Sequence, residues 1–428
     1  MNLDHNADFS VVQPVQPGQQ SEFNGSFPRS LVNPDRAMYA PRLGFAYRPK
    51  FTKDTVLRGS YGINYNTGQY ATIGRYLANQ PPFAITQSNI AGQQGCGTVE
   101  AFTLAGAFNC STAPVQNNYS ANLNYRLGHV QIWDVDIQRT MPWQIVLNIG
   151  YNGAKGGNLD MVRAPNRTAT GLLNSDAQAF AYEDSVGYSR FEALRVNARK
   201  RMTKGISLQA TYQYGHSIDN ASSVGGSGQT VAQNDLNLNA EESNSSFDIR
   251  QKLTGNWVFE LPFGPNRALL SRGGFWSKAL DGFSVSGDFT FQTGNYFTPQ
   301  YQLTSQEAAT GTTNTLRPDR DFSVPIGGTK TLGQWFNPAA FTAPPSGQFG
   351  TASRNSIEGP GTTVVDASLS RTVALGETRS FEARVTAANA LNIVNFSGIN
   401  TTLNSPTFGQ VTGASTMRTL TVFARYRF

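Results

Sequence analysis

The last thirteen residues, 416–428, alternate apolar and polar side chains, and this pattern constrains the fold more than any other stretch. One parity is apolar and comprises Leu420, Val422, Ala424, Tyr426 and Phe428. The other parity is polar and comprises Thr419, Thr421, Arg425 and Arg427. Because successive side chains of a β-strand point to opposite faces, the segment is predicted to be a strand with one apolar and one polar face.

Ten further segments show similar alternation, so eleven complete strands are predicted. The ten further segments are 40–48, 54–66, 129–139, 143–153, 191–202, 206–215, 248–261, 283–294, 362–373 and 379–392. Most have about 9 to 14 residues, near the length that a tilted transmembrane β-strand needs. A soluble β-sandwich would have strands of about five or six residues, and no repeat period indicates a propeller or solenoid. The pattern favours an all-β fold, an antiparallel transmembrane β-barrel.

Short and long connections alternate along the chain, which predicts two different ends of the sheet. The short ones are 49–53, 140–142, 203–205 and 374–378. In outer-membrane barrels the periplasmic turns are short and the outward loops are long. If the end of the last strand is periplasmic, all four short turns lie on that side. The segment 262–282 must lie there too, although it is much longer.

Four polar residues fall on the parity predicted to face lipid. Lys200 and Arg371 lie near strand ends, where a long side chain can extend to the membrane surface. For Gln251 and Asn389 a β-bulge that shifts the register is the available explanation.

Composition agrees with many strands joined by polar loops. Only 14% of the 428 residues are charged, whereas 11% are aromatic and 42 are glycine. No apolar run approaches the roughly 20 residues of a membrane-spanning helix. A negative mean hydropathy is compatible with a membrane barrel, because only every second residue of its strands meets lipid.

The beginning of the chain predicts a fragment. Residues 1–10 lack the basic region and apolar core of a secretory signal, and single-chain bacterial barrels have even numbers of strands. We therefore expect 1–39 to be a partial strand and an extracellular loop, and 40–428 to be the carboxy-terminal portion of a larger outer-membrane barrel. The alternative is that 1–12 supply a twelfth strand.

No motif indicates catalysis, a cofactor or a metal. His5, His129 and His216 lie far apart in sequence, and none has metal-ligand spacing with a cysteine. No G-x-S-x-G nucleophile motif is present. The net charge of +6 forms no basic stripe, so nucleic-acid binding is not expected.

Charged residues on the inward parity are candidates for lining a lumen. They are Asp134, Asp136, Arg195, Arg199 and Arg201. The acids could bind a cation and the arginines could line a path for an anionic solute. The favoured interpretation is that they hydrate the lumen wall or pair with charges on neighbouring strands.

The only two cysteines, Cys96 and Cys110, lie in a polar, glycine-rich segment. They are either free thiols or, in an oxidising compartment, a local disulfide that would contribute roughly 3 kcal/mol to stability.

Several segments resemble a known family. They are APRLGFAYRP (40–49), TVLRGSYGINYN (55–66), FDIRQKLTGNWVFELPFG (247–264), WFNPAAFTAPP (335–345) and NSPTFGQVTGASTMRTLTVFARYRF (404–428). Together they are similar to the carboxy-terminal barrel of TonB-dependent outer-membrane receptors, nearest to the Oar-like group. The terminal strand with its final phenylalanine resembles the closing strand of such barrels.

The resemblance implies a 22-stranded barrel of which this chain supplies about half. It also implies a plug and a TonB box in the missing amino-terminal part, through which alone the TonB complex would act. Implied partners are outer-membrane lipid, an unidentified solute that meets the long loops, and the barrel-assembly machinery. That machinery would read the terminal strand as an insertion signal, carried by Leu420, Val422, Tyr426 and Phe428.

Two other functions stay open at this point. One is a self-contained 12-stranded barrel that acts as a passive pore or an adhesion scaffold. The other is a secreted β-rich binding protein, which would purify without detergent.

Overall fold

The computed structural model describes residues 32–52, 54–79, 84, 118–174, 179–221, 232–265, 267–301, 315–376 and 378–428. The alternative twelfth strand at 1–12 and the candidate disulfide between Cys96 and Cys110 lie outside these ranges. None of the helices within them combines the length and apolarity that crossing a membrane requires.

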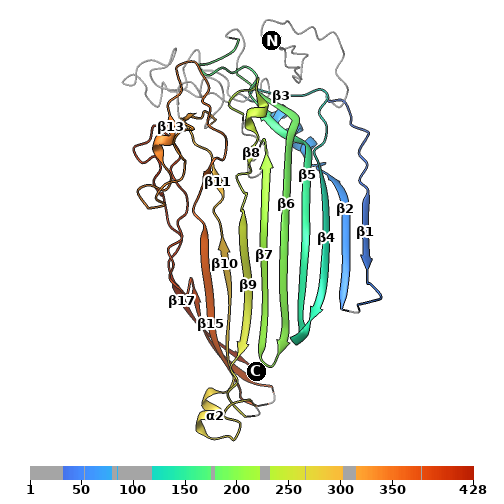
Figure 1. The fold of residues 1–428 in the computed structure, drawn as a ribbon, viewed down its shortest axis with the longest axis vertical. Coiled ribbons are helices and arrows are strands. Elements are labelled where there is room, and N and C mark those ends of the chain that lie inside the picture. The colour runs from blue at the N-terminus through green and yellow to red at the C-terminus, as the bar shows by residue number, and fades with distance from the viewer. Residues whose placement is uncertain are drawn as a thin grey trace.

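Eleven long strands form one antiparallel sheet in which spatial order follows chain order (Figure 1). They are β1 (Arg42–Tyr47), β2 (Thr55–Tyr65), β4 (His129–Met141), β5 (Ile145–Arg163), β6 (Ala181–Thr203), β7 (Ile206–Asp219), β9 (Gln251–Glu260), β10 (Phe283–Gln292), β15 (Thr362–Ala374), β16 (Ser380–Ala388) and β17 (Thr419–Arg427). Each corresponds to one predicted strand, so the predicted all-β, antiparallel fold is confirmed. Among the described residues β1 pairs only with β2 and β17 only with β16, so the sheet is not closed.

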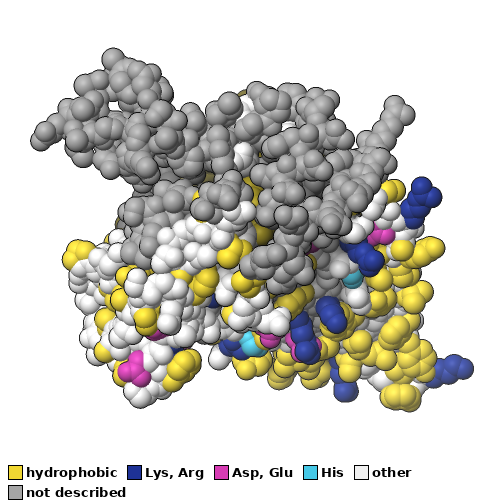
Figure 2. Space-filling view, turned by 90° about the horizontal axis from the view of Figure 1, so that it is seen from above, with side chains coloured by type: hydrophobic (Ala, Val, Ile, Leu, Met, Phe, Trp, Pro, Cys, Tyr) yellow, Lys and Arg dark blue, Asp and Glu magenta, His cyan; other side chains and the backbone are white. Residues whose placement is uncertain are grey.

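The sheet has an apolar outer face and a polar inner face, as the alternation predicted. On β10 and β15 the outward pair Val285–Leu369 is followed by the inward pair Ser284–Ser370, whose hydroxyl oxygens lie 2.8 Å apart. Large apolar side chains are exposed on the outer face and include Leu43, Phe45, Ile137, Leu208, Leu369 and Val422. Figure 2 shows hydrophobic side chains gathered along the outer wall on the right of the view.

Two strands are much longer than predicted. The predicted ends were residue 153 for β5 and residue 191 for β6, but pairing continues from Gly156–Ser189 to Arg163–Tyr182, with register irregularities around Leu159. The alternation disappears there because both faces meet protein. Met161 and Val162 are consecutive and both are buried.

Two of the polar residues on the lipid parity have partners at strand ends. The Lys200 ammonium lies 3.5 Å from the carbonyl oxygens of Thr203 and Ile206. Arg371 Nη2 donates to the Lys278 carbonyl at 2.9 Å. Both cations therefore reach backbone acceptors where the strands turn.

The predicted bulges at the other two positions are wrong. Pairing between β7 and β9 runs without interruption to Tyr214–Gln251, and Tyr212 Oη donates to Gln251 Oε1 at 3.3 Å. Asn389 lies outside β16, which ends at Ala388. Its φ is +48°, and its amide bonds both the N–H and the carbonyl of Ile393. It ends the strand instead of facing lipid.

The two ends of the sheet differ, and we call them the turn end and the loop end. Tight connections lie at the turn end together with the carboxy-terminus and helix α2 (Phe275–Leu280), whereas long segments gather at the opposite end (Figure 1). The single-turn η1 (Pro142–Gln144) joins β4 to β5. The segment between β9 and β10 thus lies at the end where the sequence placed it.

Long segments predicted as loops are folded at the loop end. Helix α1 (Gln69–Ala78) and β3 (Tyr119–Ala121) share a buried apolar cluster, and β3 extends the sheet by pairing in parallel with β6. Next to β7 lie β8 (Ser243–Asn244) and the single-turn η2 (Leu238–Glu241).

A second folded unit, the loop-end lobe, comprises 295–301, 315–361 and 393–415. Its elements are β11 (Tyr296–Phe297), β12 (Asp319–Arg320), η3 (Pro338–Ala340), β13 (Phe341–Thr342) and β14 (Ile357–Glu358). Its apolar core contains Trp335, Phe336, Phe341 and Ile357, with Phe396 and Phe408 packed against it. The long connection between β10 and β15 is therefore folded, because these aromatic side chains bury one another away from water.

Candidate functional site

A polar hollow lies on the inner face of the sheet where β4, β5, β6 and β7 run side by side. Its volume is about 550 Å³, and its lining comprises Asp134, Asp136, Asn148, Gly150, Asn152, Arg195, Asn197, Gln209 and Thr211. Strand register explains its centre, because Gly150 pairs with Asp136 on one side and with Arg195 on the other. A Cβ built on Gly150 would stand 3.1 Å from the Asp136 Cβ. The missing side chain thus leaves space between an acid and a guanidinium.

Some polar groups of the hollow are paired with one another, and two buried oxygens of its wall are not. Arg195 Nη2 donates to Asn152 Oδ1 at 3.0 Å, and the Asn197 amide donates to the Thr211 hydroxyl at 2.7 Å. In contrast, Asp136 Oδ2 and Asn148 Oδ1 have no hydrogen-bond partner within the described ranges. The lining of the hollow therefore combines carboxylate, amide and guanidinium side chains.

The structure brings three of the five predicted lumen residues together. Asp134, Asp136 and Arg195 line the hollow, whereas Arg199 and Arg201 are not part of its lining. Both lie closer to the turn end of β6, and Arg201 falls in a register irregularity between Lys200 and Thr203. In the described part of the chain, none of these arginines forms an ion pair with either aspartate.

The residues predicted as a terminal insertion signal lie on and just after the edge strand β17. Leu420, Val422 and Tyr426 pair with Ala387, Val385 and Phe381 of β16. They are exposed, as is Phe428, and the Tyr426 and Phe428 rings stack with centroids 6.3 Å apart. An exposed apolar edge of this kind suits lipid or a pairing strand.

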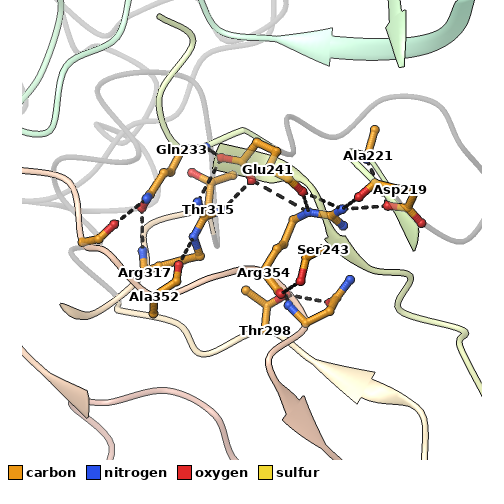
Figure 3. A network of polar contacts seen from close by, with 12 residues as sticks. Asp219, Ala221, Gln233, Glu241, Ser243, Thr298, Thr315, Arg317, Ala352 and Arg354 are labelled. Atoms are coloured by element: carbon orange, nitrogen blue, oxygen red, sulfur yellow. Dashed lines mark hydrogen bonds and ion pairs between the residues drawn. The ribbon is translucent and has the colours of Figure 1, made fainter. Parts of the chain in front are cut away.

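At the loop end, a buried polar network joins segments that are far apart in sequence (Figure 3). Glu241 accepts from Arg317 Nη1 at 2.6 Å and from Arg317 Nη2 at 3.0 Å. The Arg317 Nε donates to the Ala352 carbonyl at 2.8 Å. Arg317 and Glu241 have side-chain exposures of only 2% and 0%. Their pairing ties the lobe to the segment between β7 and β9.

A second arginine completes this network. Arg354 Nη2 donates to Asp219 Oδ1 at 2.7 Å, and its Nε donates to the Glu241 carbonyl at 3.1 Å. The Ser243 hydroxyl donates to the Arg354 carbonyl. Since the charges are matched and buried, the network can hold the lobe on β7 but offers no reactive group to a substrate.

A third buried group fastens α1 and β3 to β6. Glu183 is fully buried and accepts from the Tyr119 hydroxyl and the Gln69 amide, each at 3.2 Å. Burial, together with the neighbouring Asp160, raises the pKa of Glu183 to about 7. It also raises the pKa of the Tyr119 hydroxyl well above its ordinary value. The carboxyl therefore changes charge near neutral pH.

Sequence reasoning missed all of these loop-end residues. Glu241, Arg317 and Arg354 lie in segments without alternation, for which the sequence predicted only long connections. Trp335, Phe336 and Phe341 in the same region were an available signal, because three large aromatic residues within seven positions need burial. Within the described ranges no three His, Cys, Asp or Glu side chains gather as a metal site would require.

A model of one protein family, the outer membrane beta barrel domain, matches residues 2–421. The chain belongs to this family. The protein is therefore located in the cell outer membrane, and the apolar outer face of its sheet is the surface that lipid contacts. A comparison with curated proteins gave no match.

Solved structures with similar strand arrangements are much longer than this chain. The outer membrane transporter YddB from Escherichia coli is 10% identical with a TM-score of 0.46, covering 88% of this chain and 39% of its own. The siderophore receptor PiuA from Acinetobacter baumannii is 11% identical with a TM-score of 0.44, covering 91% and 35%. The pyoverdine receptor FpvA from Pseudomonas aeruginosa PAO1 is 10% identical with a TM-score of 0.44, covering 91% and 36%. The chain thus spans less than two fifths of the length of these proteins.

Proposed function

We propose that this chain is about half of the barrel wall of a TonB-dependent outer-membrane receptor of the Oar-like group, which imports an unidentified solute. The observation that carries the proposal is the inner wall of the sheet. Asp136, Asn148 and Arg195 face a hollow of about 550 Å³, while lipid-facing side chains cover the other face. Such a wall suits a polar solute that passes along it, and the Oar-like assignment follows from the five segments quoted above.

The open edges support a barrel with more strands. Within the described ranges, β1 and β17 each leave one side of their backbone unpaired. Each unsatisfied N–H or C=O group in lipid costs several kcal/mol, so both edges need partner strands. In this proposal they come from further strands of a 22-stranded barrel, which surrounds a plug that couples to the TonB complex.

The loop end supports a receptor role. Its segments are folded and fastened by the Arg317–Glu241 and Arg354–Asp219 pairs, so they present a shaped surface to the outside. A solute would first contact this surface and then pass to the polar inner wall. The terminal strand, with Tyr426 and Phe428, would direct insertion by the barrel-assembly machinery.

The test is energised uptake by the native cells. Culture medium is compared by mass spectrometry among wild-type cells, cells that lack the gene, and wild-type cells treated with a protonophore. We expect at least one solute to remain in the medium in both of the last two cases, because TonB-coupled import needs the proton gradient. If removal of the solute from the medium requires the gene but continues in the presence of the protonophore, the protein is a passive pore instead.

A second measurement separates the larger barrel from a self-contained one. The protein is extracted from membranes and run on a gel with and without heating, and the folded band is identified by mass. A barrel made only of this 46.4 kDa chain that conducts ions in planar bilayers would contradict the half-barrel proposal.

A further inference from the structure

The connection between β9 and β10 has a built structure, although turns at this end of an outer-membrane barrel are normally short. β9 ends at Glu260 and β10 begins at Phe283. Leu269 N donates to the Pro262 carbonyl at 2.8 Å, and Gly264 N donates to the Leu269 carbonyl at 3.2 Å. Helix α2 follows and lies beyond the strand ends (Figure 1). We call residues 262–282 the β9–β10 segment.

Large apolar side chains of the β9–β10 segment point into solvent. Phe275 is 77% exposed and Trp276 is 66% exposed. Their rings meet edge to face with centroids 5.3 Å apart, and Leu269 and Leu270 are exposed nearby. The segment therefore carries four exposed apolar side chains, two of them an aromatic pair in mutual contact, and water is a poor environment for them.

The helix that carries Phe275 and Trp276 is fastened to the lipid-facing wall. Arg371 shares the outward parity of Leu369 on β15. Its Nη2 donates to the Lys278 carbonyl at 2.9 Å and its Nε donates to the Asp281 carbonyl at 3.2 Å. Its guanidinium also lies over the outward Phe283 ring, 5.2 Å from the centroid. The end of α2 is thus fastened to the outer side of the wall, where the lipid contact surface ends.

The charges of the β9–β10 segment suit an anionic surface. It carries Arg267, Arg272 and Lys278 against one acid, Asp281. Arg267 pairs with Glu260 at 2.9 Å, whereas Arg272 and Lys278 are exposed. Aromatic side chains next to exposed cations are typical of segments that lie at the membrane–water boundary, where cations attract anionic headgroups.

We propose that the β9–β10 segment lies in the headgroup layer of the periplasmic leaflet and binds anionic phospholipid. Phe275 and Trp276 insert between the first carbons of the acyl chains. Arg272 and Lys278 contact phosphate groups of the same leaflet. The inference rests on the outer-membrane location and on the turn end facing the periplasm. It does not depend on the identity of the imported solute. The uptake test can therefore fail while the lipid-binding test succeeds, and the lipid-binding test can fail while the uptake test succeeds.

The test uses the complete protein from the outer membrane with its cysteines replaced by serine and one cysteine introduced by Phe275→Cys. An environment-sensitive dye is attached, and the protein is reconstituted in phosphatidylcholine vesicles with or without phosphatidylglycerol. Some lipids carry a nitroxide quencher on the headgroup. The matched control is Phe322→Cys, which labels a position that is 81% exposed on the loop-end lobe.

We expect the dye at position 275 to emit at shorter wavelength and to be quenched several-fold more strongly than the dye at position 322. Phosphatidylglycerol should increase that quenching, and the double substitution Arg272→Gln/Lys278→Gln should remove the increase while the blue shift remains. Equal, water-like emission at positions 275 and 322 would overturn the proposal. Quenching that is the same with and without phosphatidylglycerol would overturn the assignment of anionic headgroups. If the dye at position 275 leaves water only when periplasmic extract is added, the segment is a protein interface instead.

Discussion

Replacing Arg317 by methionine should open the loop-end lobe while the sheet stays intact. Methionine matches the arginine side chain as far as Nε and lacks the guanidinium carbon and its two terminal nitrogens, so the change removes the charge and leaves a small space beside Glu241. Three hydrogen bonds from Arg317 are lost, two of them to Glu241 and one to the Ala352 carbonyl. Glu241 then stays buried with weaker support from Arg354 Nε at 3.8 Å.

Breaking a buried ion pair by removing one partner costs about 3 to 5 kcal/mol. Because Arg354 still compensates part of the charge, the lower value of about 3 kcal/mol applies. At about 1.4 kcal/mol for each factor of ten, the population of the opened lobe should rise by about 100-fold. The effect should be local, because the strands of the sheet make none of these contacts.

Hydrogen exchange measures this population directly. Amides of 335–341 in the lobe core should exchange about 100-fold faster in Arg317→Met, while those of β10 keep their rates. The control is Glu358→Gln, which removes the exposed pair of Lys330 and Glu358 at 3.9 Å and should cost less than about 1 kcal/mol. If Arg317→Met and Glu358→Gln change exchange in the lobe equally, the buried pair is not what holds it. The double variant Arg317→Met/Glu241→Gln should recover part of the loss, since the carboxylate that Arg317 neutralised is then absent and the remaining buried charges, Arg354 and Asp219, still pair with each other.

Three further predictions concern other parts of the molecule. Burial raises the pKa of Glu183 from 4.5 to about 7, so the contribution of its protonated form to the free energy of unfolding is complete below pH 4.5 and is lost as the pH rises through 7. The total loss is about 3 kcal/mol. Amides of α1 should therefore exchange more slowly at acid than at alkaline pH, and Glu183→Gln should remove this difference. Leu369→Arg on the outer face should cost about 2 to 4 kcal/mol in folding titrations in vesicles, whereas the adjacent inner-face change Ser368→Arg should cost much less. Phe336→Ala in the lobe core should cost about 3 to 5 kcal/mol and hasten proteolysis of the lobe, and the exposed Leu332→Ala should not.

The long strands could be predicted because residues of one parity contact lipid and residues of the other parity contact water, so the two sets differ in polarity. On β10, Phe283 and Val285 face outward while Ser284 and Ser286 face inward, and this sorting is visible without knowledge of any partner strand. The same parity predicted that Asp134, Asp136 and Arg195 face inward. Their meeting in one hollow depended on register, because Gly150 had to lie between Asp136 and Arg195.

The sequence by itself determined the number, order and facing of the eleven long strands, since apolar and polar residues alternate with a period of two where one face of a strand contacts lipid and the other contacts water. Only the tertiary structure decided how far β5 and β6 extend and that the loop end is folded. There both faces of the chain contact protein, so no alternation marks the strands. The contacts that hold the lobe, Glu241 with Arg317 and Asp219 with Arg354, join residues 76 and 135 positions apart, and such separations leave no periodic trace in a sequence.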